Sequence, residues 1–320
     1  MTEYQTTLSE KTSIAITIGN FDGIHLGHQY LLHEVVKMSQ ELECQPVIVT
    51  FAPHTLIVVR PQLTILCLTT LEEKLALAKR YGGVKDTIVI HFTPEVAAQS
   101  AEDFMESLST RFTIRGLIVG SDFSLGHNRM GDVSFLEEYG RQHGIQVRAL
   151  PLEQANQTRI SSTRIRSLVS EGKIVEANAL LGHPLVLGGI VEHGDERGRL
   201  LGFPTANTHT DPHQLLPING VYAVRVSIHN GNTSDLEEVS TVYNGVANIG
   251  IRPTFNGKDR LVEVHLLDTD LNLYDKYLRV EFIEYLRGEQ RFSGVEALKD
   301  QISLDVQQAR RILASRRVSN

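Results

Sequence analysis

Short apolar segments alternate with amphipathic ones through residues 14–150, and this alternation constrains the fold more than any other feature of the sequence. Apolar runs of this length, rich in β-branched side chains, are typical of buried strands. A regular strand–helix order predicts right-handed βαβ units, and therefore an α/β fold with a parallel sheet covered by helices on both faces. The expected strands are 14–18, 46–51, 87–91, 117–120 and 146–150, and the expected helices lie near 31–36, 71–80, 101–109 and 135–143.

The pattern changes near residue 183, after which short strands separated by turn residues dominate. This pattern predicts a small antiparallel barrel. A chain of 320 residues is long enough for two domains, expected at 1–183 and 184–320. The expected strands of the second are 185–192, 221–228, 239–246, 261–267 and 277–285. A helix should close the chain, with one apolar face made of Val295, Leu298, Ile302, Val306, Ala309 and Leu313.

The charge balance excludes some classes of partner. There are 31 lysines and arginines against 38 aspartates and glutamates, so we expect no binding to nucleic acid, which needs a positive surface. No apolar run approaches the roughly 18 residues of a spanning helix, and we expect no membrane insertion. The polar first residues lack the apolar core of a signal peptide, which favours a cytoplasmic location. Cys44 and Cys67 have neither the number nor the spacing of a disulfide framework or a zinc site.

The sequence GNFDGIHLGH, residues 19–28, follows the first expected strand and opens the first helix. Glycines permit tight turns and close approach of a ligand, and the N–H groups of a helix N-terminus suit a phosphate. His25 and His28 are three residues apart, so both project from one side of the first helical turn. Two imidazoles there can donate hydrogen bonds to phosphate oxygens as charge develops on them. Two other interpretations remain: half of a metal site with Asp22, or a helix-capping loop.

Two more segments carry polar groups suited to a nucleotide. Residues 159–166 precede and open another helix, with Ser162 as a plausible N-cap and Arg164 and Arg166 placed to hold outer phosphates. An ordinary capped helix with solvated arginines is the alternative. In the glycine-rich loop 194–207, Thr205 and Asn207 would project to one side of an extended segment and offer oxygen ligands to Mg²⁺. The alternative there is a simple hairpin loop.

Glu263 is the best candidate for a general base. In the strand 261–267, Val262, Val264 and Leu266 alternate on the core face, so Glu263 points to the other face. A carboxylate in that position could accept the proton of an alcohol that attacks a phosphate. The alternative is a solvated strand carboxylate with no catalytic role.

These motifs together resemble a known family. HLGH at 25–28 with ISSTRIR at 160–166 resembles the HxGH nucleotidyltransferases, which transfer a nucleotide monophosphate from ATP and release pyrophosphate. GNFDGIHLGH, TFAPH at 50–54 and VGSDFSLG at 119–126 resemble the bifunctional bacterial riboflavin kinase/FMN adenylyltransferases. GFPTAN at 202–207, GVANIGIRPTF at 245–255 and VEVHLLD at 262–268 resemble their riboflavin kinase domain, a six-stranded barrel. The resemblance covers almost the whole chain, with the motifs in the right order.

The resemblance implies a Rossmann-like adenylyltransferase domain followed by the kinase barrel, with roles for particular residues. His25 and His28 would contact the ATP phosphates, and Glu263 would activate the ribityl 5′-hydroxyl of riboflavin. Thr205 and Asn207 would serve Mg²⁺ and ATP. The other nucleotide-binding candidates are Gly19, Asn20, Phe21, Asp22, Gly23, Gly27, Ser161, Ser162, Thr163, Arg164, Arg166, Gly194, Gly198 and Gly202. The flavin-binding candidates are Phe51, Pro53, His54, Asp122, Phe123, Asn248, Arg252 and Thr254.

Two positions depart from the family pattern. Relatives often carry a second aromatic residue where this chain has Leu125, and often read Pro-His-Pro where it has Pro53-His54-Thr55. Both departures concern the flavin side rather than the phosphates. For Phe51 and Phe123, a plain core role is the alternative to flavin contact.

The sequence thus predicts two consecutive enzymes: a kinase that makes FMN from riboflavin and ATP, and an adenylyltransferase that makes FAD from FMN and ATP. Two other functions remain open at this point. One is a nucleotidyltransferase for another substrate with the barrel as a binding module. The other is a flavin carrier or regulator without catalysis.

Overall fold

The computed structural model describes residues 3–151, 154–155, 158–192, 202–230, 241–254, 257–269 and 271–316. Its contacts divide the chain into two compact units. The first unit contains Met1–Cys67 and Lys74–Ser161, and the second contains Leu68–Glu73 and Ser162–Asn320. Among the helices in the described ranges, none is both long and apolar enough to cross a membrane.

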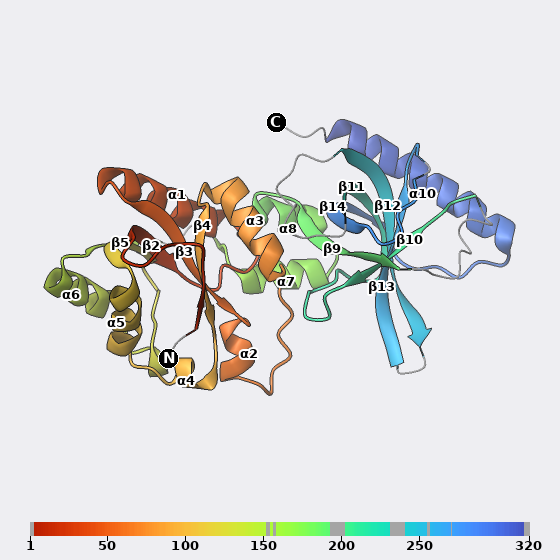
Figure 1. The fold of residues 1–320 in the computed structure, drawn as a ribbon. Helices are drawn as coiled ribbons and strands as arrows, with labels where there is room; N and C mark the ends of the chain where they lie inside the picture. The colour runs from red at the N-terminus through yellow and green to blue at the C-terminus, as the bar shows by residue number, and fades with distance from the viewer. Residues whose placement is uncertain are drawn as a thin grey trace. The chain divides into compact units, whose positions relative to one another are not determined.

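Six strands form the sheet of the first unit, in the order β1-β4-β3-β2-β5-β6 (Figure 1). From β2 to β6 all neighbours are parallel, which confirms the predicted α/β fold, and β1 joins the edge antiparallel to β4. The strand order reverses between β2 and β5, the place where open α/β sheets bind ligands at the carboxyl ends of their strands. The strands are β1 Tyr4–Gln5, β2 Ser13–Ile18, β3 Gln45–Ala52, β4 Asp86–His91, β5 Thr113–Gly120 and β6 Gln146–Leu150.

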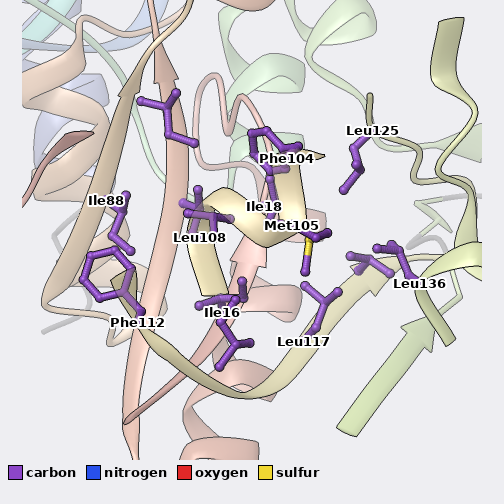
Figure 2. Close-up of a cluster of buried hydrophobic side chains, with 14 of the residues drawn as sticks. Ile16, Ile18, Ile88, Phe104, Met105, Leu108, Phe112, Leu117, Leu125 and Leu136 are labelled. Carbon is purple, nitrogen blue, oxygen red and sulfur yellow. The ribbon is translucent and has the colours of Figure 1, made fainter. Parts of the chain in front are cut away.

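Helices cover both faces of this sheet because successive strand residues point to opposite sides. Ile16 and Ile18 pack with Phe104 and Met105 on one face (Figure 2), whereas Ala15 packs with residues of α1 on the other. The helices of this unit are α1 Leu26–Glu41, α2 Thr55–Val59, α3 Leu71–Gly82, α4 Pro94–Ala97, α5 Ala101–Arg111, the 3₁₀ turn η1 His127–Arg129 and α6 Val133–His143. A short hairpin of β7 Gln154–Ala155 and β8 Thr158–Arg159 follows β6.

The second unit is a closed barrel of six antiparallel strands in the order β10-β13-β12-β11-β14-β9, as the resemblance implied (Figure 1). The helix α10, Val295–Ser315, buries Ala309 and Leu313 against Val221 and Ile283 of the barrel. The strands are β9 Leu185–Glu192, β10 Ala206–Thr210, β11 Gly220–His229, β12 Val242–Thr254, β13 Gly257–Leu266 and β14 Tyr277–Arg287.

Two segments from earlier in the chain pack with the barrel. The helices α7, Ser162–Ser170, and α8, Ile174–Leu181, belong to the second unit, and Asn178 of α8 donates a hydrogen bond to the carbonyl of Phe282 at 2.8 Å. The short segment Leu68–Glu73, which includes the start of α3, does the same through the Glu73–Arg279 ion pair at 3.2 Å. The expected boundary between residues 183 and 184 stays a prediction.

Several elements differ from the sequence-based expectations. The short elements β1, α2, α4 and α8 were not predicted, nor was β10, whose polar residues hide its alternation. β12 extends well beyond the expected strand 239–246, of which residues 239 and 240 lie outside the described residues. The helix α7 already includes Ser162, which was expected to precede it as the N-cap. Val295, expected on the buried face of the last helix, is 55% exposed because it lies in the first turn of α10.

Candidate active sites

The loop between β2 and α1 places the predicted histidines at a helix N-terminus. His25 is the N-cap of α1, and its Nδ1 accepts a hydrogen bond from the backbone N–H of His28 at 3.3 Å. Gly23 adopts φ +84°, a conformation that favours glycine and turns the chain into the helix. The loop follows β2, at the switch point of the sheet where a ligand is expected.

The two imidazoles lie face to face. Their ring centroids are 3.5 Å apart and their planes differ by 13°. Since His25 Nδ1 accepts a hydrogen bond, the neutral ring carries its proton on Nε2. His28 Nδ1 is buried and, within the described part of the chain, has no hydrogen-bond partner. An N–H there would be costly, so His28 also holds its proton on Nε2 and both rings offer an Nε2–H donor.

The protonation state of His28 follows from its surroundings. Burial lowers the pKa of His28 well below its usual value, and the nearby charges of His25 and Lys74 lower it further. His28 is therefore neutral near pH 7, a hydrogen-bond donor rather than a fixed cation. The described residues contain no group of three or more His, Cys, Asp or Glu suited to a metal, and stacked rings do not converge on one ion. This geometry favours phosphate contact over the alternative metal half-site.

Other residues of the GNFDG loop lie beneath its surface. Phe21 is 2% exposed and packs its ring edge against His28, with centroids 5.1 Å apart. A side chain on Gly19 would meet that ring at 3.1 Å, so glycine allows the close approach. Asp22 is also buried, and Gly27 lies half-buried in the first turn of α1. Phe21 thus packs against His28, and a direct contact of Phe21 or Asp22 with a nucleotide stays a prediction.

Asn20 is held by a residue where this chain departs from its relatives. Its Nδ2 donates to Thr55 Oγ1 at 2.9 Å, and its Oδ1 accepts from the Thr55 backbone N–H at 3.1 Å. The Thr50 hydroxyl donates to the Asn20 carbonyl at 3.2 Å. The ends of β2 and β3 are therefore tied together through side chains at the switch point.

The flavin-binding candidates fall into two groups. Phe51 is a core residue, packed against Phe92 and Phe104, which favours its structural interpretation. The nearby Pro53 follows a cis peptide bond, and His54 caps α2 by accepting from the backbone N–H of Leu56 at 3.2 Å.

After β5, Asp122 is exposed at the same end of the sheet, and Phe123 packs partly on the core. Leu125, the second departure from the family pattern, is only 9% exposed and lies in the core cluster that Figure 2 shows. In this chain that position serves packing. Flavin contact by Asp122 and Phe123 stays a prediction.

Residues 159–166 lead into the helix α7, as the sequence predicted. Ser162 begins the helix, Ile165 is buried on its inner face, and Thr163 is exposed. Arg164 and Arg166 are half-buried, each with contacts within the protein. Ser161 is the last residue of the first unit, whereas α7 groups with the second. A pyrophosphate role for these residues stays a prediction.

In the barrel, three strands bring the predicted polar side chains side by side. Glu263 of β13 pairs in register with Asn207 of β10 on one side and with Asn248 of β12 on the other. Asn248 Nδ2 donates to Glu263 Oε2 at 3.1 Å, which orients the carboxylate. Val262 and Val264 are buried, so Glu263 points away from the barrel core as the alternation predicted. The sequence pattern found the three residues, and the register shows that they are neighbours.

Thr205 lies at the start of β10 beside a pocket. It is exposed, whereas Ala206 and Thr208 are buried, so Thr205 and Asn207 share the outward face as expected. His265 of β13 holds the preceding segment in place, because its Nδ1 donates a hydrogen bond to the Pro204 carbonyl at 2.8 Å. The pocket encloses about 290 Å³, and its walls include Val191, Thr205, Leu266, Leu271 and Tyr274.

The oxygen donors of this site suit Mg²⁺. A hydroxyl at Thr205 and an amide oxygen at Asn207 are hard ligands, the kind that Mg²⁺ combines with phosphate oxygens and water. Gly202 lies in the described chain before β10. The candidates Gly194 and Gly198 lie outside the described residues, and Arg252 and Thr254 are described only by their backbone in β12.

The sequence analysis did not single out Lys74, Thr50 or His265 as site residues. Lys74 sits in an amphipathic helix, where a lysine is ordinarily solvated, yet it is 7% exposed. Thr50 and His265 fall inside quoted motifs but carry no spacing signal of their own. Only the packing of β3 against α3 and of β13 against the 203–205 segment reveals their contacts.

Comparisons with known proteins agree with the two expected activities. The two folds and their polar side chains define a bifunctional ATP-dependent transferase. Family models for FAD synthetase and riboflavin kinase match residues 7–164 and 181–313. A bifunctional riboflavin kinase/FMN adenylyltransferase of Buchnera aphidicola is 37% identical over 92% of each chain. One of Escherichia coli K12 is 36% identical, over 92% of this chain and 91% of its own. The chain belongs to the bifunctional riboflavin kinase/FMN adenylyltransferase family.

A solved structure is similar to this chain along most of its length. A crystal structure from Streptococcus pneumoniae, described as a macrolide-efflux protein, aligns with a TM-score of 0.81 and 29% identity. The alignment covers 93% of this chain and 94% of that one, so the likeness extends through both units.

Proposed function

We propose that the chain makes FAD from riboflavin in two ATP-dependent steps at two separate sites. The barrel phosphorylates riboflavin to FMN, and the α/β unit transfers AMP from a second ATP to FMN, releasing pyrophosphate. The observation that carries this proposal is the coincidence of each motif set with its own architecture, in a chain matched by family models for both activities. Membership of the family supports riboflavin, FMN and ATP as substrates.

In the kinase step, Glu263 is the base. Its carboxylate, oriented by Asn248, takes the proton of the ribityl 5′-hydroxyl as that oxygen attacks the γ-phosphorus of ATP. The bond from the γ-phosphorus to the bridging oxygen breaks, and ADP leaves. Thr205 and Asn207 would hold Mg²⁺, which when bound neutralises charge on the phosphates. The pocket beside Thr205 has room for a ring of one of the substrates.

In the adenylyl step, no protein nucleophile is needed. A phosphate oxygen of FMN attacks the α-phosphorus of ATP, the bond to the bridging oxygen of the β-phosphate breaks, and pyrophosphate leaves. The Nε2–H groups of His25 and His28, at the positive end of α1, stabilise the negative charge that develops on the phosphate oxygens. We place this chemistry in the cytoplasm, with small molecules as the substrates and without nucleic acid or membrane partners.

A product profile with two variants tests the proposal. Wild type with riboflavin, ATP and Mg²⁺ should give FMN and then FAD, separated by chromatography. His28→Ala should lower FAD formation by roughly 10²- to 10³-fold and let FMN accumulate, because a donor to the transition state is lost. Glu263→Ala should lower FMN formation by roughly 10²- to 10⁴-fold yet convert supplied FMN to FAD.

Two exposed residues provide matched controls. His33→Ala, on the same helix as His28, and Glu296→Ala, in α10, should both retain the wild-type profile. If either site variant removes both activities while the protein stays folded, the two-site assignment is wrong. A wild type that turns over ATP with another acceptor, or binds flavin without turnover, would favour one of the two other functions left open by the sequence.

A further inference from the structure

Lys74 is a buried cation that the proposed adenylyl-transfer chemistry has not used. It lies in the first half of α3 and is 7% exposed. Its Nζ donates to Thr50 Oγ1 at 3.2 Å and approaches the Phe51 carbonyl at 3.5 Å. Thr50 in turn donates to the Asn20 carbonyl at 3.2 Å. A continuous chain of polar contacts therefore runs from the ammonium to the GNFDG loop.

The titratable groups near Lys74 lie in the GNFDG loop, in α1 and in the segment just before α3. Burial lowers the pKa of Lys74, while the nearby Asp22 carboxylate and the Cys67 thiol oppose that shift. His28 of α1 is also near: burial lowers its pKa most, and the charges of His25 and Lys74 lower it further. Asp22, which is 2% exposed, belongs to the loop, and His28 belongs to the stacked pair. Lys74 is therefore near both the Asp22 carboxylate and the His28 imidazole, which belong to the same sequence, GNFDGIHLGH.

A purely structural role would not explain the choice of a lysine. Burying an ammonium is costly unless it is paired and hydrogen-bonded, and an apolar side chain of similar length would fill the space without that cost. Despite the free-energy cost of burying its ammonium, this chain has a lysine here, at the end of the sheet where the phosphates are expected. Its polar partners are the carboxyl end of β3 and the loop after β2, the two segments that meet at Asn20.

We propose that Lys74 is a positioning residue for adenylyl transfer, whose ammonium holds the GNFDG loop through Thr50 and so keeps the Nε2–H of His28 directed at the phosphates. Its charge also opposes protonation of His28, in addition to the larger effect of burial. This inference rests on the proposed adenylyl-transfer function. Lys74 moves no proton and forms no bond to substrate in this role. It sets the geometry of the residues that do and contributes to their protonation state.

The test compares Lys74→Met with Lys74→Arg, which keeps the charge. Lys85→Met, the same exchange at an exposed lysine just after α3, is the matched control. In Lys74→Met we expect FAD formation to fall about tenfold or more at neutral pH, since the loop loses its anchor. The acid limb of its pH profile should move to higher pH, because a like charge no longer opposes protonation of His28. Lys74→Arg should recover most of both losses.

A second measurement does not depend on catalysis. The ring of His28 can be followed by NMR with ¹⁵N-labelled histidine, its signal assigned by its loss in His28→Gln. In wild type it should titrate below the ordinary value of about 6.5, and in Lys74→Met its midpoint should rise. Circular dichroism and thermal unfolding of each variant report whether the first unit is folded, and riboflavin kinase activity reports the same for the barrel.

Each outcome decides something. A wild-type His28 that titrates at or above 6.5 overturns the inference even if Lys74→Met does not fold. A folded Lys74→Met with the wild-type rate, pH profile and His28 titration overturns it as well. A wild type that makes FMN but no FAD contradicts the proposed adenylyl transfer instead, so the two failures are distinguishable.

Discussion

At the scale of single residues, Thr55 shows how one departure from the family pattern changes a contact. Its hydroxyl and backbone N–H both bind the Asn20 side chain, at 2.9 and 3.1 Å. A proline in that position has neither donor nor hydroxyl. A proline at position 55 would therefore remove both contacts, and in this chain Thr55 holds Asn20.

Thr55→Pro tests that contact without breaking the fold. Thr55 is the first residue of α2, where proline is well tolerated, and His54 has the extended backbone that precedes proline readily. Loss of two hydrogen bonds should lower kcat/KM for FAD formation by about tenfold and leave FMN formation unchanged. Steady-state kinetics of both steps measure the effect. Thr55→Ser, which keeps both groups, is the control, and an unchanged FAD rate in Thr55→Pro would show that Asn20 needs no such support.

At the scale of elements, α3 carries two consecutive buried charges with different tasks. Lys74 binds to the sheet, while Glu73 is paired with Arg279 of β14. The Glu73 side chain is fully buried, and burial raises its pKa although the Arg279 guanidinium opposes this. Arg279 also donates to Glu281 Oε1 at 2.6 Å. The sequence of α3 looks like that of an ordinary amphipathic helix, yet the helix contains Glu73, which forms a buried ion pair with Arg279.

Arg279→Met should lower the free energy of unfolding, because it leaves the buried Glu73 carboxylate without its cation. Without its cation, Glu73 stays charged in an apolar site at neutral pH, and we expect a loss of about 3–5 kcal/mol in unfolding free energy. The folded pKa of Glu73 rises further above its unfolded value, so the loss is largest at high pH and shrinks as the pH falls toward 5. Urea unfolding at several pH values measures this. In Glu73→Gln/Arg279→Met the deficit should be smaller and flat with pH, and a pH-independent deficit in the single variant would contradict the explanation.

The elements that sequence predicted well are those with an uninterrupted hydrophobic period. β6 and β9 have the expected bounds, and α10 begins where expected. β10 was missed because Thr208, which is 1% exposed, occupies a core position that a pattern search assigns to solvent. For the same reason the pattern of α3 gives no sign that Glu73 and Lys74 are buried, at 0% and 7% exposed. Burial of polar side chains depends on partners from other elements, which periodicity does not contain.

At the scale of the whole molecule, the two family matches leave residues 165–180 between them, which include all of α8 except Leu181. The helix buries Ile174, Leu180 and Leu181, and the Asn178 side chain joins it to β9 and β14. By its contacts this helix supports the barrel, although the sequence predicts the boundary after it. Whether the barrel domain begins before or after α8 therefore depends on how much this helix stabilises the barrel.

Two fragments of the chain test where the kinase domain begins. A fragment of residues 184–320 loses the burial of three large apolar side chains of α8, each worth about 1.5–3 kcal/mol. We expect it to be several kcal/mol less stable than a fragment of residues 162–320, and only the longer one should keep substantial riboflavin kinase activity. Thermal unfolding and FMN formation measure the difference. Equal stability of the two fragments would support the boundary at 183 and 184.

The sequence by itself determined the strand–helix order, the change to a barrel, the two motif sets and hence the class of chemistry. These depend on local periodicity and on residues placed at the ends of neighbouring elements. Only the tertiary structure decided that Glu263 lies between Asn207 and Asn248, that the rings of His25 and His28 stack, and that Lys74 is buried beneath the GNFDG loop. Register, desolvation and the pairing of buried charges arise between segments far apart in the chain, so no local pattern encodes them.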